Sequence, residues 1–155
     1  MRKRKPRLRI ITPDPRFGDE MVTRFVNNLM MRGKKSLAYR VFYDAMDIMK
    51  ERTGEDPHAV WKDALNNATP QVEVRSRRIG GATFQIPTEI PGNRKLSIGM
   101  KWIIRFARLR NGKGMAEKLA AELIAASKGE GAAVKRKEDT HRMAEANRAF
   151  AHFRT

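Results

Sequence analysis

The stretch that decides the fold is VEVRSRRIGGATFQI, residues 72–86, in which two alternating segments flank a pair of glycines. Tight hairpin turns need positive φ angles at their centre, and glycine adopts these without strain. Gly80 and Gly81 therefore predict a two-residue turn between antiparallel strands, in a hairpin at about residues 71–90. Pro87 cannot donate a ladder hydrogen bond, which a strand at the edge of a two-stranded ribbon tolerates.

The predicted turn also determines which side chains share a face of the ribbon. Residues directly opposite each other lie on the same face, so one face carries Arg75, Arg77, Ile79, Phe84 and Ile86, and the other carries Val72, Val74, Ser76 and Arg78. Guanidinium groups beside an aromatic ring suit phosphates and stacked bases. Alternatively, Phe84 packs on the body and the arginines are solvated, and a slip of one residue would exchange the faces. We expect the ribbon to project from the body without a core of its own.

Helical periodicity dominates on both sides of the ribbon. Before it, we expect helices from Asp19 to Gly33, from Ser36 to Gly54 and from Asp56-Pro57 to Pro70. After it, we expect helices from near Leu96, from Met115 to Lys128 and from about Lys135 to Phe150. The fourth helix should bury a stripe of Leu96, Met100, Ile103, Ile104 and Ala107. The sequence thus predicts a mainly α fold, a single domain of about six helices with one projecting β-hairpin arm.

Residues 1–18 differ in composition from the rest of the chain. They contain three prolines and six basic residues, Arg2, Lys3, Arg4, Lys5, Arg7 and Arg9. Prolines and a run of like charges favour an extended chain over a packed helix. We therefore predict an extended basic N-terminal arm at 1–18 and a helical domain at 19–155.

The charge of the chain calls for a polyanionic partner. The sequence has 33 Lys and Arg against 17 Asp and Glu, a net charge of +16, and 41% of its residues are hydrophobic, enough for a core. The excess persists without the arm, so the body is basic as well. Nucleic acid is the first candidate partner, and an anionic membrane surface is the second. There is no cysteine and no apolar run long enough to span a membrane, and a cytoplasmic location is permitted.

A basic stripe lies on the predicted fourth helix. Arg94, Lys101, Arg105 and Arg108 are spaced by seven, four and three residues, which brings them to one side of a helix, and no acidic residue lies between them in the sequence. The alternative is an ordinary solvated face. Two further cations follow a glycine, Lys34 and Lys35, and they suit either phosphate contact or charge stabilisation of the preceding helix end.

Enzymatic interpretations find little support. The histidines, His58, His141 and His152, lack metal-ligand spacing. Asp44, Asp47 and Glu51 align on the second helix, but Arg40 precedes Asp44 by four residues, so a solvated face with a salt bridge is favoured. We therefore expect no enzyme, no cofactor and no metal.

The sequence resembles a known family in several strings. These are EVRSRRIGGA at residues 73–82, FYDA at 42–45, KED at 137–139 and RMAEANRAFAH at 142–152. The chain is similar in these strings, and in the order of its helices, to bacterial small-subunit ribosomal protein seven.

The resemblance implies a structural component of the small ribosomal subunit. Members of the family bind the 3′ major domain of the ribosomal RNA, help to nucleate assembly of the subunit head, and place the hairpin and the C-terminal helix near the exit site for transfer RNA. The implied partners are small-subunit ribosomal RNA, exit-site transfer RNA, nearby messenger RNA and the neighbouring small-subunit proteins nine, eleven, thirteen and nineteen. No membrane partner is implied.

Charge and resemblance together give the residues that we assign to these roles. The ribosomal RNA contacts are Arg2, Lys3, Arg4, Lys5, Arg7, Arg9, Lys34, Lys35, Arg75, Arg77, Arg78, Arg94, Lys101, Arg105, Arg108, Arg110, Lys113, Met115, Lys135, Arg136 and Arg142. The residues near transfer RNA are Ile79, Gly80, Gly81, Ala82, Phe84, Arg148, His152 and Arg154.

One alternative function stays open beside the ribosomal one. Some DNA-binding architectural proteins insert a β-arm into the minor groove, and such arms often carry an apolar wedge at the tip. The tip of the predicted arm is Gly80-Gly81, which lacks a wedge. A binding competition between folded RNA and duplex DNA distinguishes the two functions.

Overall fold

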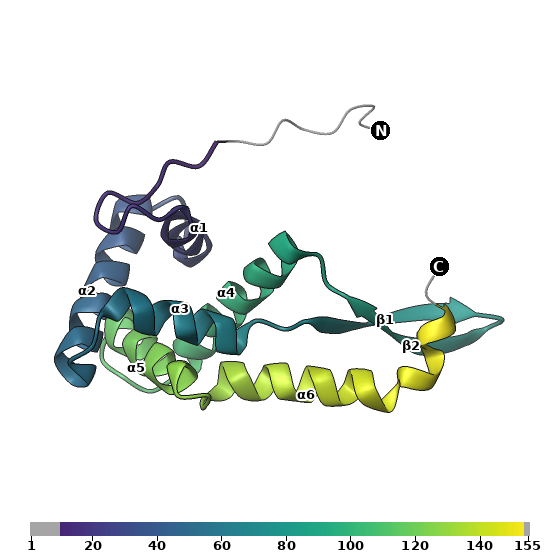
Figure 1. The fold of residues 1–155 in the computed structure, drawn as a ribbon. Helices are drawn as coiled ribbons and strands as arrows, with labels where there is room; N and C mark the ends of the chain where they lie inside the picture. The colour runs from purple at the N-terminus through teal and green to yellow at the C-terminus, as the bar shows by residue number, and fades with distance from the viewer. Residues whose placement is uncertain (1–9, 154–155) are drawn as a thin grey trace.

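The computed structural model describes residues 10–153, and within them the chain is mainly helical (Figure 1). The helices are α1 (Glu20–Leu29), α2 (Lys35–Thr53), α3 (Pro57–Ala68), α4 (Gly92–Leu109), α5 (Met115–Ser127) and α6 (Ala132–Ala146), followed by the 3₁₀ helix η1 (Arg148–Phe153). The strands β1 (Val72–Ile79) and β2 (Ala82–Glu89) form one antiparallel pair. The predicted fold class, helices with one hairpin arm, is confirmed.

The core lies among α1 to α5 and the start of α6, and it is centred on aromatic side chains. Trp61 of α3, Phe25 of α1 and Phe42 of α2 are fully buried. The Trp61 ring meets Phe25 and Phe42 edge to face, at centroid distances of 5.8 and 6.0 Å, a geometry that adds to the large area these side chains bury. The body to which the arms attach is therefore closely packed around these rings.

Several helix boundaries follow the predicted signals. Asp19 and Asp56 cap α1 and α3, since each side-chain carboxylate accepts backbone N–H groups from the first turn. Gly54 ends α2 in the left-handed conformation at φ 72°.

Other predicted boundaries are wrong. α1 ends at Leu29 rather than at Gly33, because Met30 already has extended ψ, and α2 begins at Lys35, before Ser36. α4 begins at Gly92 instead of near Leu96, since its exposed first turn has no apolar residue to reveal the period. α6 runs from Ala132 to Ala146, and the chain then tightens into η1.

The hairpin has the predicted register. Ile79 lies opposite Ala82, Arg77 opposite Phe84 and Arg75 opposite Ile86. Gly80 and Gly81 form the turn with φ of 56° and 92°. Both angles lie in the left-handed region, which is why glycine occurs here.

The hairpin projects beyond the body, but it is not the free ribbon that we expected. α6 runs beneath it and η1 turns up against β2 (Figure 1). Ile86 is 1% exposed, and the Phe84 ring lies 5.3 Å from that of Phe150 in η1. At the base of the hairpin, the Gln71 N–H donates to His141 Nε2 of α6 at 3.1 Å. The ribbon is therefore supported along one side by the C-terminal elements.

The last residues of the predicted N-terminal arm pack against the body. The Thr23 hydroxyl donates to the Thr12 carbonyl at 2.9 Å, and the Tyr43 hydroxyl donates to buried Asp14 at 2.6 Å. The Phe17 ring also stacks on the His58 ring at 5.0 Å. The segment before Gly18 is thus anchored, whereas the division of the chain at residue 18 stays a prediction.

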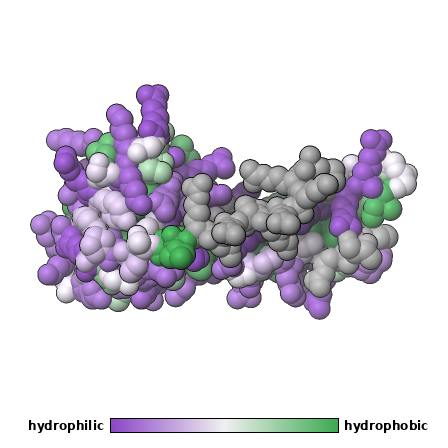
Figure 2. Space-filling view, turned by 90° about the horizontal axis from the view of Figure 1, so that it is seen from above, coloured by the Kyte–Doolittle hydropathy of each residue, from purple (hydrophilic) through white to green (hydrophobic). Residues whose placement is uncertain are grey.

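The face of the body that is seen from above in Figure 2 is mainly polar. Seen from above, hydrophilic side chains cover most of the visible face outside the grey atoms (Figure 2). The larger exposed apolar residues among those described are Ile10, Met31, Leu37, Leu109 and Met143. No helix in the described part of the chain is both long and apolar enough to cross a membrane.

Candidate nucleic-acid interface

The position of α4 follows from a close crossing with α3. At Gly99 the two helices approach so closely that a Cβ atom would lie 2.6 Å from the Thr69 hydroxyl oxygen. Met100, Ile103, Ile104 and Ala107 turn inward as predicted. The opposite face of α4 is therefore directed outward, toward α1 and the solvent.

Two cations on that face lack an acidic partner among the described residues. Lys101 and Arg105 are exposed and form no ion pair with any residue of 10–153. They line an open groove of about 310 Å³, here called the α4 groove, with Asn28, Ile104, Arg108 and Leu109. A groove with unpaired cations on a rigid helix is suited to bind phosphates.

The other two cations of the predicted stripe are engaged within the protein. Arg108 donates to the Leu29 carbonyl at the end of α1, at 3.2 Å, although its side chain also borders the α4 groove. Arg94 donates to Glu73 of β1 at 3.0 Å. The prediction of one free stripe is therefore only partly right, because the sequence between these residues says nothing about an acid on a neighbouring strand.

Glu73 holds two of the predicted RNA-binding arginines. Both Arg75 and Arg94 form ion pairs with it, at 2.6 and 3.0 Å. Burial acts to raise the pKa of the Glu73 carboxyl, but the hydrogen bonds from the arginines outweigh it, and the pKa lies below its ordinary value. This cluster ties the base of the hairpin to the start of α4.

The loop between α1 and α2 carries a second group of cations. Arg32 has a left-handed backbone at φ 53°, and Lys34 and Lys35 follow Gly33 at the start of α2. α1 ends at Leu29, so neither lysine lies in its last turn, although Lys34 and Leu29 line the same pocket. Cations at a helix N-terminus meet an unfavourable dipole, which an anionic ligand would relieve.

An apolar pocket opens beside this loop, with a volume of about 440 Å³. We call it the loop pocket, and it is lined by Leu29, Met31, Arg32, Lys34, Leu37, Ala38, Val41, Arg108 and Met115. Met31 and Leu37 are 61% and 50% exposed, and cations stand at its rim. The sequence pointed to Met115, Lys34 and Arg108 but not to Arg32 or Met31, since nothing in a Met-Arg pair signals an unusual φ.

The hairpin presents two further exposed cations, Arg77 and Arg78, which form no ion pair within 10–153. Arg75 is held by Glu73, as described above. Phe84 is half-buried, and its ring packs against Phe150 of η1 rather than against the helical body. Ile79, Gly80, Gly81 and Ala82 form the tip as predicted.

Arg110 has a structural role that the sequence did not reveal. Its guanidinium is paired with Glu122 of α5, whose carboxylate is fully buried and also accepts the Ala133 N–H at 3.0 Å. The three groups join the α4–α5 loop, α5 and the start of α6. Arg110 is thus a poor candidate for RNA contact.

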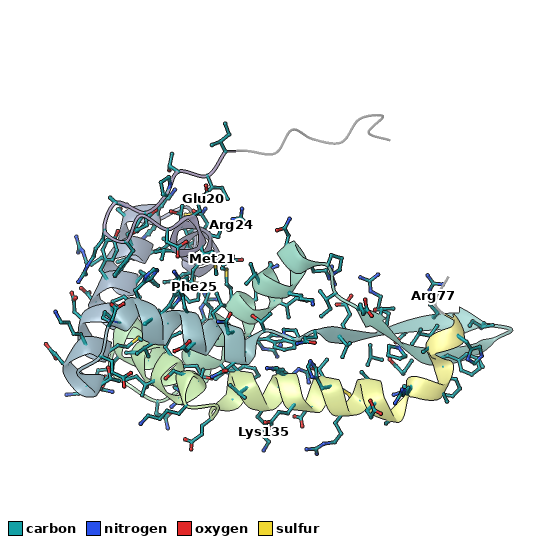
Figure 3. The ribbon with its side chains drawn as sticks, in the orientation of Figure 1. Glu20, Met21, Arg24, Phe25, Arg77 and Lys135 are labelled. Carbon is teal, nitrogen blue, oxygen red and sulfur yellow. The ribbon has the colours of Figure 1, made fainter. Side chains whose placement is uncertain are left out.

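Two of the remaining predicted cations, Lys135 and Arg142, line one open groove together with the acidic Glu138 and Asp139. Lys113, Lys135, Arg136 and Arg142 are exposed or partly exposed. Lys135 projects from the underside of α6, whereas Arg77 points to the other side of the molecule (Figure 3). Near the C-terminus, Arg148 forms an exposed pair with Glu145 at 3.4 Å, and His152 is exposed. Arg2, Lys3, Arg4, Lys5, Arg7, Arg9 and Arg154 lie outside the described residues.

The acidic row on α2 differs from its predicted pairing. Arg40 and Asp44 form no ion pair, and Asp47 is instead paired with Arg16 of the N-terminal segment. The Arg16 guanidinium lowers the pKa of Asp47, chiefly through its hydrogen bond. Across residues 10–153, no group of three or more His, Cys, Asp or Glu side chains could hold a metal ion.

Comparison with known proteins identifies the family. The family described as ribosomal protein S7p/S5e matches residues 1–148. The chain belongs to this family.

Curated relatives agree in name and length. The small ribosomal subunit protein uS7 of Cytophaga hutchinsonii is 62% identical over 154 residues, 99% of both chains. Proteins of the same name from Flavobacterium psychrophilum and Porphyromonas gingivalis are 60% and 62% identical over 157 residues, again 99% of both chains. The predicted family is therefore confirmed, and it is one of ribosomal proteins rather than enzymes.

Proposed function

We propose that this small-subunit ribosomal protein binds the 3′ major domain of the ribosomal RNA through the α4 groove, the α1–α2 loop and the basic residues 2–9. The observation that carries the proposal is that Lys101 and Arg105 are exposed on a rigid helix and lack an acidic partner within residues 10–153. A net charge of +16 repels itself in the folded state. An RNA backbone supplies the missing anions, and binding early would help to nucleate assembly of the subunit head.

The loop pocket supports a more detailed contact. Its apolar lining includes Met115, and its rim carries Arg32, Lys34 and Arg108. An unpaired base could enter the pocket while the adjoining phosphates contact the rim, because single-stranded RNA exposes both apolar bases and charged backbone. This assigns Met115 to RNA contact through packing rather than charge.

A salt titration with the in vitro transcribed 3′ major domain RNA tests the function. If roughly six to ten phosphates are neutralised, affinity should fall by about 10³–10⁵ between roughly 50 and 200 mM salt. A flat response would contradict the proposal. Duplex DNA of equal length serves as competitor, and preferential binding to the duplex would favour the architectural DNA-binding alternative.

We further propose that the hairpin tip, with Arg148 and His152, lies near transfer RNA at the exit site, close to messenger RNA and beside small-subunit proteins nine, eleven, thirteen and nineteen in cytoplasmic ribosomes. The family resemblance supports this placement, as do Arg77 and Arg78, which are exposed and unpaired within 10–153. The double variant Arg77→Ala, Arg78→Ala should leave subunit yield unchanged and lower exit-site occupancy. Loss of subunit formation would instead assign the arm to assembly.

A further inference from the structure

A further groove, distinct from the α4 groove and the loop pocket, lies where the N-terminal segment meets α2. It has a volume of about 530 Å³. Pro13 and Pro15 of the N-terminal segment line one side of the groove. The other side is lined by α2 residues that include Tyr39, Arg40, Tyr43 and Asp44. We call it the tyrosine groove. None of the RNA-binding residues assigned above lines it.

The two tyrosines of the groove differ in what their side chains already contact. The Tyr43 hydroxyl donates to Asp14, and the Arg16 guanidinium lies over the Tyr43 ring at 5.4 Å. Tyr39 is half-buried and packs partly against the core, and its hydroxyl forms no hydrogen bond within residues 10–153. Its ring also contacts that of Tyr43 and the Lys35 ammonium, which lies 5.8 Å from the ring centroid. Tyr43 therefore anchors the N-terminal segment, whereas Tyr39 remains open to a ligand.

The charges around Tyr39 favour an anionic ligand. Arg40 is exposed and has no acidic partner in the described chain, and Lys35 is exposed at the helix N-terminus. The cation–π contact of an exposed lysine is weak, whereas a base stacked on an aromatic ring is held more strongly. Lys35 can therefore leave the ring for a phosphate at a net gain.

From this arrangement we propose that the tyrosine groove binds one unpaired nucleotide of RNA, with its base stacked on Tyr39 and its flanking phosphates on Lys35 and Arg40. The site rests on the proposed function, because it needs an RNA already held by the neighbouring Lys34. Asp44 can only accept hydrogen bonds, so it suits a base edge with amino or imino donors rather than a phosphate. A proline-rich peptide is a less favoured ligand. Pro13 and Pro15 already lie in the groove beside the tyrosines, and such a peptide would supply no anion for Lys35 and Arg40.

The test compares the affinity of three full-length proteins for the 3′ major domain RNA: the unmodified protein and two variants at position 39. Tyr39→Phe retains the ring and should bind like the unmodified protein. Tyr39→Leu retains much of the apolar bulk but removes the stacking face, and it should bind roughly 5- to 100-fold more weakly. Circular dichroism melting should show that both remain folded. Equal binding by Phe and Leu variants would overturn the groove while leaving the proposed function intact.

Arg40→Ala gives a second test that does not depend on the packing of Tyr39. It should lower the slope of log affinity against log salt by about 1, whereas Lys50→Ala, an exposed change of equal charge on the same helix, should not. Ultraviolet crosslinking of reconstituted subunits should attach a nucleotide to Tyr39. A crosslink from Tyr39 to a ribosomal peptide would overturn the proposal in favour of a protein contact. Failure of the unmodified protein to bind the RNA would reject the proposed function itself.

Discussion

The α4 groove and the α4–α5 junction look alike in sequence but differ in structure. Both carry basic side chains within the same ten residues of sequence, Lys101 and Arg105 in the groove and Arg110 at the junction. At the junction the cation is neutralised by buried Glu122, whereas in the groove neither cation has an acidic partner within 10–153. In a chain this basic, the sign of a residue does not identify the interface. The absence of an internal acidic partner marks a candidate interface cation, whereas its presence predicts that a substitution changes stability rather than binding.

The largest expected effect is on stability, at the junction. Arg110→Ala leaves the buried Glu122 carboxylate without its cation, and breaking a buried pair in this way costs about 3–5 kcal/mol. The partial exposure of the guanidinium places the expected loss near the lower end of that range. Urea unfolding should measure the free energy of unfolding.

The affinity of the Arg110→Ala variant for RNA provides the contrast. Under conditions in which the variant stays folded, its affinity should lie close to that of the unmodified protein. A variant that keeps its stability and loses affinity would show that Arg110 contacts RNA after all, as the sequence alone suggested.

A second effect, on binding, is expected in the α4 groove. The double variant Lys101→Ala, Arg105→Ala should weaken binding to the 3′ major domain RNA by roughly tenfold or more at moderate salt and reduce the salt slope by about 2. Its free energy of unfolding should change little, because exposed substitutions rarely exceed about 0.5 kcal/mol. Filter binding and thermal melting should be measured on the same preparation.

A charge-matched control separates a local contact from a general loss of charge. Lys50→Ala, Lys128→Ala removes two exposed cations that lie outside the grooves described above. If this control weakens binding as much as the groove variant does, net charge rather than the groove governs affinity.

The sequence predicted the parts of this molecule that depend on local rules. The Gly80-Gly81 turn requires positive φ, and this alone determined the hairpin register. The caps at Asp19 and Asp56 and the inward stripe of α4 are local in the same sense. The predicted basic residues also included Lys101 and Arg105.

The features that the sequence missed depend on contacts between distant residues. Glu122 lies 12 residues from Arg110, and Glu73 lies 21 from Arg94, so no helical spacing links them. Support of the hairpin by Phe150 involves a segment that we expected to continue α6. No sequence motif distinguished Tyr39 from Tyr43. The two differ only in the structure, where Arg16 and Asp14 contact Tyr43.

The smallest expected effect concerns pH and the arginines on Glu73. The pKa of this carboxyl is lower in the folded protein than its ordinary value of 4.5. A depressed folded-state pKa contributes stability that is present above the unfolded value and is lost as pH falls through the folded value. Stability from this cluster should therefore be constant at neutral pH and decline below about pH 4.5.

Glu73→Gln isolates that contribution. The glutamine keeps the size of the side chain but cannot be ionised, so the variant should be less stable than the unmodified protein at neutral pH by about 1 kcal/mol or less, because both arginines are half-exposed. The difference between the two proteins should be smaller at acid pH than at neutral pH, because it is lost as pH falls through the depressed pKa of Glu73. Urea unfolding at both pH values measures it, and a difference that persists or grows in acid would mean that the ion pairs do not stabilise the base of the hairpin. RNA affinity should rise slightly or stay constant in the variant, since Arg75 and Arg94 lose their internal partner and become like Lys101 and Arg105.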